Sequence, residues 1–226
     1  MRSFPVAVDL GARDGTFAAM LAQSPARDRI GLLIETDLSE QMLRGRGGPR
    51  LVVDDERLPF RDASLDLVVS TLSLHWANDL PGVFVQARRA LKPDGVFIAS
   101  FLGGGTLYEL RQCLVEAETE IKGGAGPRVS PFADAEDAAG LLQRAGFKLP
   151  VADFDRVSVR YPHPQALIAD LRRMGETNVL SERPGPLNRS VLMRAFELYG
   201  ERFDSENGVE ATFEIITATG WAPAAI

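Results

Sequence analysis

Cysteine and histidine are scarce in this chain of 226 residues, which has one cysteine, Cys113, and two histidines. A single cysteine excludes a disulfide framework and a cysteine-rich metal site within the sequence. No apolar run is long enough to span a bilayer. Positive charge is in deficit, since 25 Lys and Arg face 31 Asp and Glu, a formal net charge of −6. Because nucleic-acid binding requires a basic face, this balance argues against a nucleic-acid substrate.

Apolar segments that alternate with helical patterns are what the chain does contain. Hydrophobic residues make up 45% and charged residues 25%, which are ordinary globular values, and this length can bury one sizeable core. The alternation from residue 6 to 101 predicts an α/β fold with a doubly wound, mostly parallel sheet. We expect residues 1–226 to form a single domain in the cytoplasm, without a transmembrane segment, and peripheral membrane contact stays open.

The chain begins with a strand, a glycine-bearing turn, a helix and a second strand that ends in acids. The strands are expected at residues 6–10 and 30–34, and the acids are Glu35 and Asp37. Such a unit binds a nucleoside-bearing cofactor, because the turn lets the backbone approach the ligand and an acid accepts hydrogen bonds from the ribose hydroxyls.

The turn distinguishes between two kinds of cofactor. A dinucleotide fingerprint G-x-G-x-x-G starting at Gly11 would need glycine at Arg13 and Thr16, and both positions fail. The pattern D-x-G-x-G-x-G fits at Asp9, Gly11 and Gly15, and only its middle glycine is replaced, by Arg13. That pattern is typical of S-adenosylmethionine-dependent methyltransferases. A long side chain at this position predicts backbone strain if Arg13 has a positive φ.

Later segments extend the match. An acidic loop follows a predicted strand at 51–60, a buried strand is predicted at 64–70, and a helix end, turn and strand at 91–98. This succession resembles the core of the class I S-adenosylmethionine-dependent methyltransferases over residues 5–102. Residues 70–81 and 102–111 resemble one branch, the methyltransferase-like assembly factors of respiratory complex I, whose relative is the malonyl-acyl-carrier-protein methyltransferase of biotin synthesis. Further matches lie at 116–120, 130–132, 144–147, 174–178 and 211–221.

The resemblance implies more of the fold. It implies an antiparallel last strand, here at 211–219. Relatives carry a helical segment upstream of the first strand that closes over the cofactor, and this sequence starts almost directly at that strand. Two segments, 103–131 and 164–206, are additional to the minimal core. We expect both to lie over the carboxyl ends of the strands and to form a substrate lid.

The cofactor implied by the resemblance is S-adenosylmethionine, or its product S-adenosylhomocysteine. Asp37 is expected to bind the ribose hydroxyls; Glu35 is its rival, and the alternative role for Asp37 is the N-cap of the next helix. The resemblance assigns Asp9 to the methionyl amine and Asp54 to the adenine amino group, with a backbone N–H at Asp55 for the ring. The expected cofactor-binding residues are Asp9, Gly11, Gly15, Asp37, Leu38, Asp54, Asp55, Ser70 and Trp76.

Four residues are candidates for work at the reacting centre. Trp76 is expected either to hold the sulfonium charge by cation–π attraction or to pack in the core. His75 is the candidate general base or orienting group. Tyr108 and Arg111 lie one helical turn apart, and this pair suits a substrate with a carboxylate or a guanidinium group, the alternative being that both pack on the surface. The predicted catalytic residues are His75, Tyr108 and Arg111, and no metal site is expected.

Three functions remain open at this point. The first is methyl transfer to a protein client, a respiratory complex I subunit being one candidate, or to an acyl-carrier-linked acceptor. The second is arginine hydroxylation of a client subunit, since complex I assembly factors of this type are associated with it. An iron site of two histidines and one carboxylate would have to use both His75 and His163, and their spacing gives no support for it. The third is a non-catalytic assembly chaperone.

Overall fold

The computed structural model describes residues 2–129, 134–177 and 185–224. The chain divides into two compact units. The first unit comprises residues 1–102, 133–154 and 216–226, and the second comprises 103–132 and 155–215. Each unit is described by itself.

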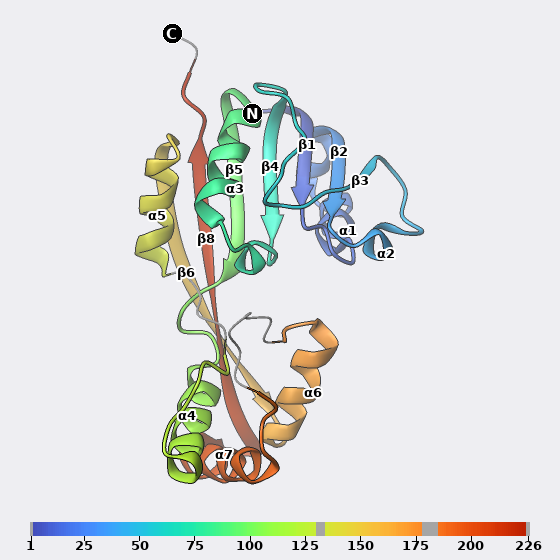
Figure 1. The fold of residues 1–226 in the computed structure, drawn as a ribbon. Helices are drawn as coiled ribbons and strands as arrows, with labels where there is room; N and C mark the ends of the chain where they lie inside the picture. Colours follow the sequence, from blue (N-terminus) through green and yellow to red (C-terminus); the bar gives the residue numbers. More distant parts are fainter. Residues whose placement is uncertain (1, 130–133, 178–184, 225–226) are drawn as a thin grey trace. The chain divides into compact units, whose positions relative to one another are not determined.

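The first unit is built on a sheet whose parallel strands carry the apolar segments. These strands are β1 (Phe4–Leu10), β2 (Ile30–Asp37), β3 (Arg50–Val52), β4 (Leu65–Thr71) and β5 (Leu91–Leu102). Strand β1 pairs with β2 on one side and β4 on the other, so that Ala7 lies opposite both Leu33 and Leu67. The strand order is β3-β2-β1-β4-β5-β8-β6, completed by β6 (Lys148–Tyr161) and β8 (Gly208–Trp221). The β8 arrow points against those of β1 and β4 (Figure 1).

Short helices connect these strands. They are α1 (Thr16–Ala22), η1 (Pro25–Arg29), α2 (Glu40–Leu43), η2 (Leu74–Trp76), α3 (Leu80–Ala90) and α5 (Ala135–Arg144). Helix α3 begins where Asp79 accepts a hydrogen bond from the Gly82 N–H at 2.9 Å, which satisfies one of the free donors at a helix start. Its buried face packs on β5 and α5. An edge contact between Phe84 and Phe97 and a tilted contact between Phe97 and Phe147 belong to this core.

The second unit has its own hydrophobic core. It contains α4 (Tyr108–Lys122), α6 (Pro164–Met174), α7 (Arg189–Arg202), β7 (Asp204–Ser205) and parts of β6 and β8. Helices α4 and α7 pack together through buried residues that include Cys113, Ala195 and Tyr199. Surface ion pairs also join these helices, from Arg194 to Glu120 and from Arg202 to Glu116.

The fold class predicted from the sequence is confirmed: the sheet is mostly parallel and its last strand is antiparallel, as in class I methyltransferases. The predicted lid segments, 103–131 and 164–206, belong to the second unit. Their work as a lid over a substrate, and the single-domain organisation, stay predictions. Parts of both segments, the whole match at 130–132 and the last residue of the match at 174–178 lie outside the described residues. In the described part of the chain, no helix combines the length and the apolar character needed to cross a membrane.

Candidate cofactor site

Asp9 is the most unusual charged residue of the first unit. It lies near the carboxyl end of β1, beside Glu35 in register, and its side chain is fully buried. Neither of its carboxylate oxygens has a hydrogen-bond partner among the described residues. Burial raises the pKa of Asp9 to about 7, and the nearby carboxylates of Glu35, Asp55 and Asp37 add to the rise, while Arg46 opposes it. A buried acceptor of this kind is costly unless a donor or a cation approaches it.

A second carboxylate, that of the half-buried Asp55, lies close to Gly11 of the glycine turn. Gly11 has a φ of 66°, and a Cβ placed on it would lie 1.9 Å from the Ser73 Oγ. The Ser73 hydroxyl donates to Asp55 Oδ2 at 3.2 Å, while the Oδ1 atom of Asp55 is buried without a hydrogen-bond partner in the described chain. Burial raises the pKa of Asp55 to about 6. Asp9 and Asp55 therefore each present an unsatisfied acceptor near this turn.

Asp37 holds the turn from the neighbouring strand. Its Oδ2 accepts from the Arg13 backbone N–H at 2.9 Å, and its Oδ1 accepts from the Ser39 N–H at 2.8 Å. Helix α2 begins after Ser39, so Asp37 is not its N-cap. The carboxylate of Asp37 is thus fixed at the end of β2 by two backbone donors.

Glu35, the predicted rival for the ribose, is committed elsewhere. Arg46 donates to the Glu35 Oε1 at 2.8 Å and to the Arg13 carbonyl oxygen at 2.8 Å. A Cβ on Gly15 would lie 2.1 Å from the Arg46 Nη1, so the glycine is needed for the guanidinium to lie there. Asp37 as the ribose ligand stays a prediction.

Arg13 has the positive φ, 46°, that its place in the glycine pattern predicts. Its N–H is bonded to Asp37, its carbonyl to Arg46, and its guanidinium donates to the Leu72 carbonyl at 3.0 Å. These contacts oppose the cost of a left-handed conformation in a residue with a side chain. Arg13 therefore occupies the turn without disrupting it.

The other predicted cofactor residues differ in exposure. Ser70 is buried and its hydroxyl donates to the Leu10 carbonyl at 2.9 Å, which ties β4 to β1. Asp54 is exposed and accepts from the Glu56 N–H, and Leu38 is 70% exposed beside Asp37. Leu38 was predicted only as a cofactor-binding residue, and its contact with the cofactor stays a prediction.

His75 and Trp76 form part of η2, after β4. Their ring centroids are 5.3 Å apart, and both side chains are half-buried, whereas the preceding Leu74 is buried in the core. The core role is thus taken by Leu74, and Trp76 keeps a partly exposed ring. Their roles toward cofactor and substrate stay predictions.

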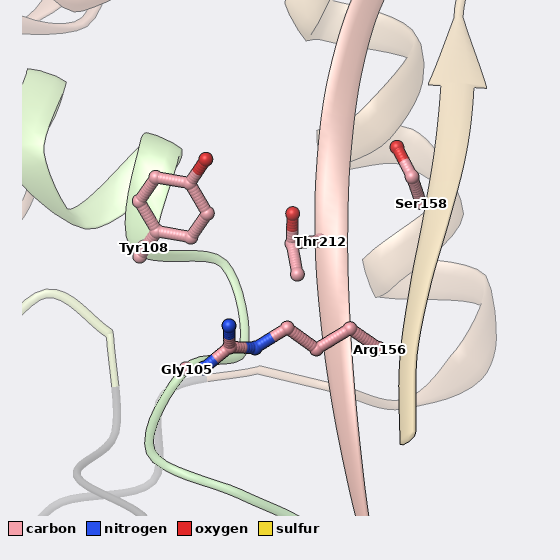
Figure 2. Close-up of a pocket in the computed structure, with 5 residues that line it drawn as sticks. All are labelled: Gly105, Tyr108, Arg156, Ser158 and Thr212. Carbon is pink, nitrogen blue, oxygen red and sulfur yellow. The ribbon is translucent and has the colours of Figure 1, made fainter.

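Tyr108 and Arg111 belong to the second unit. Tyr108 lines a pocket of about 380 Å³ there (Figure 2). The Arg111 guanidinium donates to the carbonyl oxygens of Gly104 and Thr106 at 3.2 and 3.3 Å. The structure therefore gives Arg111 a role in holding the loop before α4, and its predicted contact with a substrate stays a prediction. Within the described ranges, no three His, Cys, Asp or Glu side chains are grouped so that they could hold a metal ion.

Two residues of the site were not identified from the sequence. Ser73 lies inside the matched segment 70–81, so the motif carried a signal for it, but nothing indicated a contact with Asp55. Arg46 lies in a polar loop with no motif. Its partners are 11 and 33 residues away in sequence, and only the fold brings them together.

The buried acids, the glycine turn and the strand order together define a class I methyltransferase fold with a cofactor site at the carboxyl ends of its strands. Comparison with known proteins agrees, because a family model described as a methyltransferase domain matches residues 8–99. A putative methyltransferase from Bacillus halodurans has the same fold, with a TM-score of 0.64 and 15% identity over 99% of this chain and 94% of that chain.

Sequence relatives narrow the class. The protein is 40% identical to the mitochondrial arginine-hydroxylase NDUFAF5 of Danio rerio, over 98% of this chain and 70% of that protein. It is 41% identical to NDUFAF5 of Mus musculus, over 97% of this chain and 65% of the relative. A malonyl-[acyl-carrier protein] O-methyltransferase of Methylovorus is 32% identical over 96% of this chain and 75% of that enzyme. The chain belongs to the methyltransferase-domain family that contains the NDUFAF5 arginine-hydroxylases and these O-methyltransferases. It spans about 65% of the length of the mouse relative.

The residues present fit S-adenosylmethionine, the cofactor that the methyltransferase domain supports. S-adenosylmethionine carries a positive ammonium and a positive sulfonium group, and the first unit offers unsatisfied carboxylate oxygens on the buried Asp9 and the half-buried Asp55. The turn has no Cβ at Gly11 or Gly15, where the space is already taken by Ser73 and Arg46. The predicted family and cofactor class are therefore confirmed.

Proposed function

We propose that this chain binds S-adenosylmethionine in its first unit and catalyses methyl transfer to a protein or carrier-linked acceptor. The observation that carries the proposal is the buried, unsatisfied carboxylate of Asp9, with Asp55 nearby. Carboxylates crowded in a buried place repel one another, and this arrangement is disfavoured in the unliganded protein. A cationic cofactor removes both the repulsion and the unsatisfied acceptors.

Each residue of the site has a defined task in this proposal. Asp9 accepts from the methionyl ammonium group, and Asp37 accepts from the ribose hydroxyls, as two backbone N–H groups already fix its position. Leu38 and Asp54 line the adenine side, with the backbone of Asp55. When bound, the cofactor supplies an electrophilic methyl group on a positively charged sulfur. Catalysis then rests mainly on how the chain positions the acceptor.

Proton transfer depends on the acceptor. A carboxylate nucleophile has no proton to lose, whereas a nitrogen or hydroxyl nucleophile must lose one. We assign that proton to the His75 imidazole, which lies in η2 directly after β4. Trp76 supplies the aromatic ring that attracts the sulfonium charge.

The acceptor is proposed from the relatives. The NDUFAF5 relatives are named as arginine-hydroxylases, and they favour a protein client, with a respiratory complex I subunit as the candidate. The relatives named for malonyl-carrier methylation favour a carrier-linked carboxylate instead. A cytoplasmic location remains a proposal, and the NDUFAF5 relatives are mitochondrial by name.

Arginine hydroxylation is the second candidate function, and the relatives' names are the observation that favours it. It would need an oxidant such as dioxygen and a source of two electrons. Methylation and hydroxylation add different masses to the client, a methylene group in the first case and an oxygen atom in the second.

Mass spectrometry of a client tests the proposal directly. The protein is incubated with S-adenosylmethionine and candidate clients, and the products are digested and mapped. A methylene addition, lost in Asp37→Ala, supports methyl transfer. An oxygen addition shifts the assignment to hydroxylation, and an unmodified client that nevertheless binds supports the chaperone role.

A further inference from the structure

The pocket of the second unit is a separate feature from the cofactor site. Its volume is about 380 Å³, and Gly105, Tyr108, Arg156, Ser158 and Thr212 line it. These residues come from the loop before α4, from α4 itself, and from β6 and β8. Figure 2 shows the Arg156 guanidinium extending toward Gly105, with Tyr108 and Thr212 beside it and Ser158 on the neighbouring strand.

The acids near this pocket are already satisfied. Glu214 accepts from the Gly105 N–H at 3.0 Å and from Arg156 Nε at 3.0 Å. Glu109 accepts from both the backbone N–H and the hydroxyl of Thr212. Neither acid has the unsatisfied oxygens that would attract a cationic ligand, in contrast to Asp9 in the first unit.

Hydrogen-bond donors remain available instead. The hydroxyls of Tyr108 and Ser158 make no hydrogen bond to any described residue. The Arg156 guanidinium pairs with Glu214 through Nε, its side chain is 62% exposed, and it lines the pocket. Two hydroxyl donors and a guanidinium line this one pocket, and such groups match a carboxylate, because charge-assisted hydrogen bonds to an anion are stronger than neutral ones.

We propose that this pocket binds a carboxylate, and that its source is an acidic side chain of the protein client. This assignment of the pocket depends on the proposed function in one respect, the assumption that the acceptor is a protein client. The other source of the same chemistry is the carboxylate of a malonyl thioester. Arg156 is the residue expected to distinguish a carboxylate from a neutral group, since its side chain carries the positive charge.

Arg160 provides a matched control on the same strand. Its side chain is 63% exposed and pairs with Glu210 at 3.6 Å, but it does not line the pocket. Replacing Arg160 by Gln changes the net charge by the same amount as replacing Arg156. A loss of binding in both variants would reflect general electrostatic attraction, and a loss in Arg156→Gln alone would reflect a site.

The test is an NMR titration of the whole ¹⁵N-labelled chain with N-acetylglutamate N-methylamide, a blocked residue with a free side-chain carboxylate. We expect the Gly105 amide signal to shift on titration, Arg156→Gln to weaken binding at least about tenfold, and Arg160→Gln to bind like the unsubstituted chain. Arg156→Lys and Ser158→Ala guard against a folding defect, since the first should retain part of the binding and the second should weaken it. The dispersion of each spectrum reports on folding.

Three results would overturn the proposal: equal binding of the blocked glutamine analogue, unchanged binding by Arg156→Gln, or equal loss in Arg160→Gln. Tighter binding of a malonyl thioester than of the glutamate probe would overturn the client as the source. Calorimetry of S-adenosylmethionine on the same samples tests the cofactor site separately. A failure of one site is thereby distinguished from a failure of the other.

Discussion

At the scale of residues, the question is whether Asp37 or Glu35 binds the ribose hydroxyls of the cofactor. Asp37 was predicted from its place after the second strand, and in the structure two backbone donors hold it beside the glycine turn. Glu35, only two residues earlier, is paired with Arg46. The sequence pattern alone left both acids open, because it shows position along a strand and not partners from other loops.

We therefore predict different effects for the two acids. Asp37→Ala should weaken S-adenosylmethionine binding by about 1.5–3 kcal/mol, the scale of hydrogen bonds to a charged group. Glu35→Ala should weaken it less, because that carboxylate bonds to Arg46 and not to the ligand. Isothermal titration calorimetry of both variants measures this order. A larger effect for Glu35→Ala would show that the ribose binds one pleat earlier on β2.

The ionised form of Asp9 that is proposed to bind the cofactor lowers the stability of the unliganded folded protein. Its pKa is raised from 3.8 to about 7 by burial and by nearby carboxylates. The stability that its neutral form contributes is fully present below pH 3.8 and is lost as the pH rises through 7. At about 1.4 kcal/mol per pKa unit, the ionised form costs up to a few kcal/mol at pH 8.

Asp9→Asn should accordingly make the unliganded protein more stable at pH 8 while it weakens cofactor binding. Urea unfolding at pH 5 and at pH 8 measures the first effect, and the gain in the free energy of unfolding should be larger at pH 8. A variant that is less stable than the parent at pH 8 would contradict the assignment of Asp9 as a strained, ligand-directed acid.

At the scale of elements, the glycine turn between β1 and α1 has two separate requirements. Gly11 needs a positive φ and also needs to lack a Cβ, because that atom would overlap Ser73. Gly45 shares the positive φ, 75°, but has no atom within 4 Å of an added Cβ. A comparison of Gly11 with Gly45 therefore separates the cost of backbone strain from the cost of steric overlap.

Gly45→Ala should cost about 1 kcal/mol of stability, the cost of a left-handed conformation for a residue with a side chain. Gly11→Ala should cost clearly more and should also abolish cofactor binding, since Ser73 must move away from Asp55. Thermal unfolding and calorimetry compare the two variants. Equal losses of stability with binding intact in Gly11→Ala would show that the turn tolerates a side chain.

The elements themselves were largely predictable. The alternation of apolar strands and helical patterns predicted the strands β1, β2, β4 and β5, because burial on both faces of a parallel sheet leaves a strong hydrophobic signal. The antiparallel direction of β8 was implied only by the family resemblance. The second helix, α2, was harder to predict, since it has only four residues. The contacts of Arg46 and Ser73 were not predictable, because each joins loops that only the strand order brings together.

At the scale of the molecule, cofactor binding should raise the free energy of unfolding of the first unit. A ligand that binds only the folded state raises stability by about 2.7 kcal/mol at a hundred times its dissociation constant. We predict this gain with S-adenosylmethionine or S-adenosylhomocysteine and none with NAD, because the dinucleotide pattern fails at Arg13 and Thr16. Differential scanning fluorimetry with each ligand tests it, and stabilisation by NAD alone would contradict the cofactor assignment.

The central claim is that the buried carboxylate of Asp9 binds a positively charged group of S-adenosylmethionine. Calorimetry of S-adenosylmethionine binding from pH 5.5 to 8.5, in buffers of different ionisation enthalpy, tests it most directly. Because the cation requires ionised Asp9, whose pKa is about 7, binding should release a proton below pH 7 and weaken by up to about tenfold per pH unit there. Asp9→Asn should bind weakly and lose this pH dependence. Affinity that is constant across the range in the parent chain, or the same pH dependence in Asp9→Asn, would contradict the account.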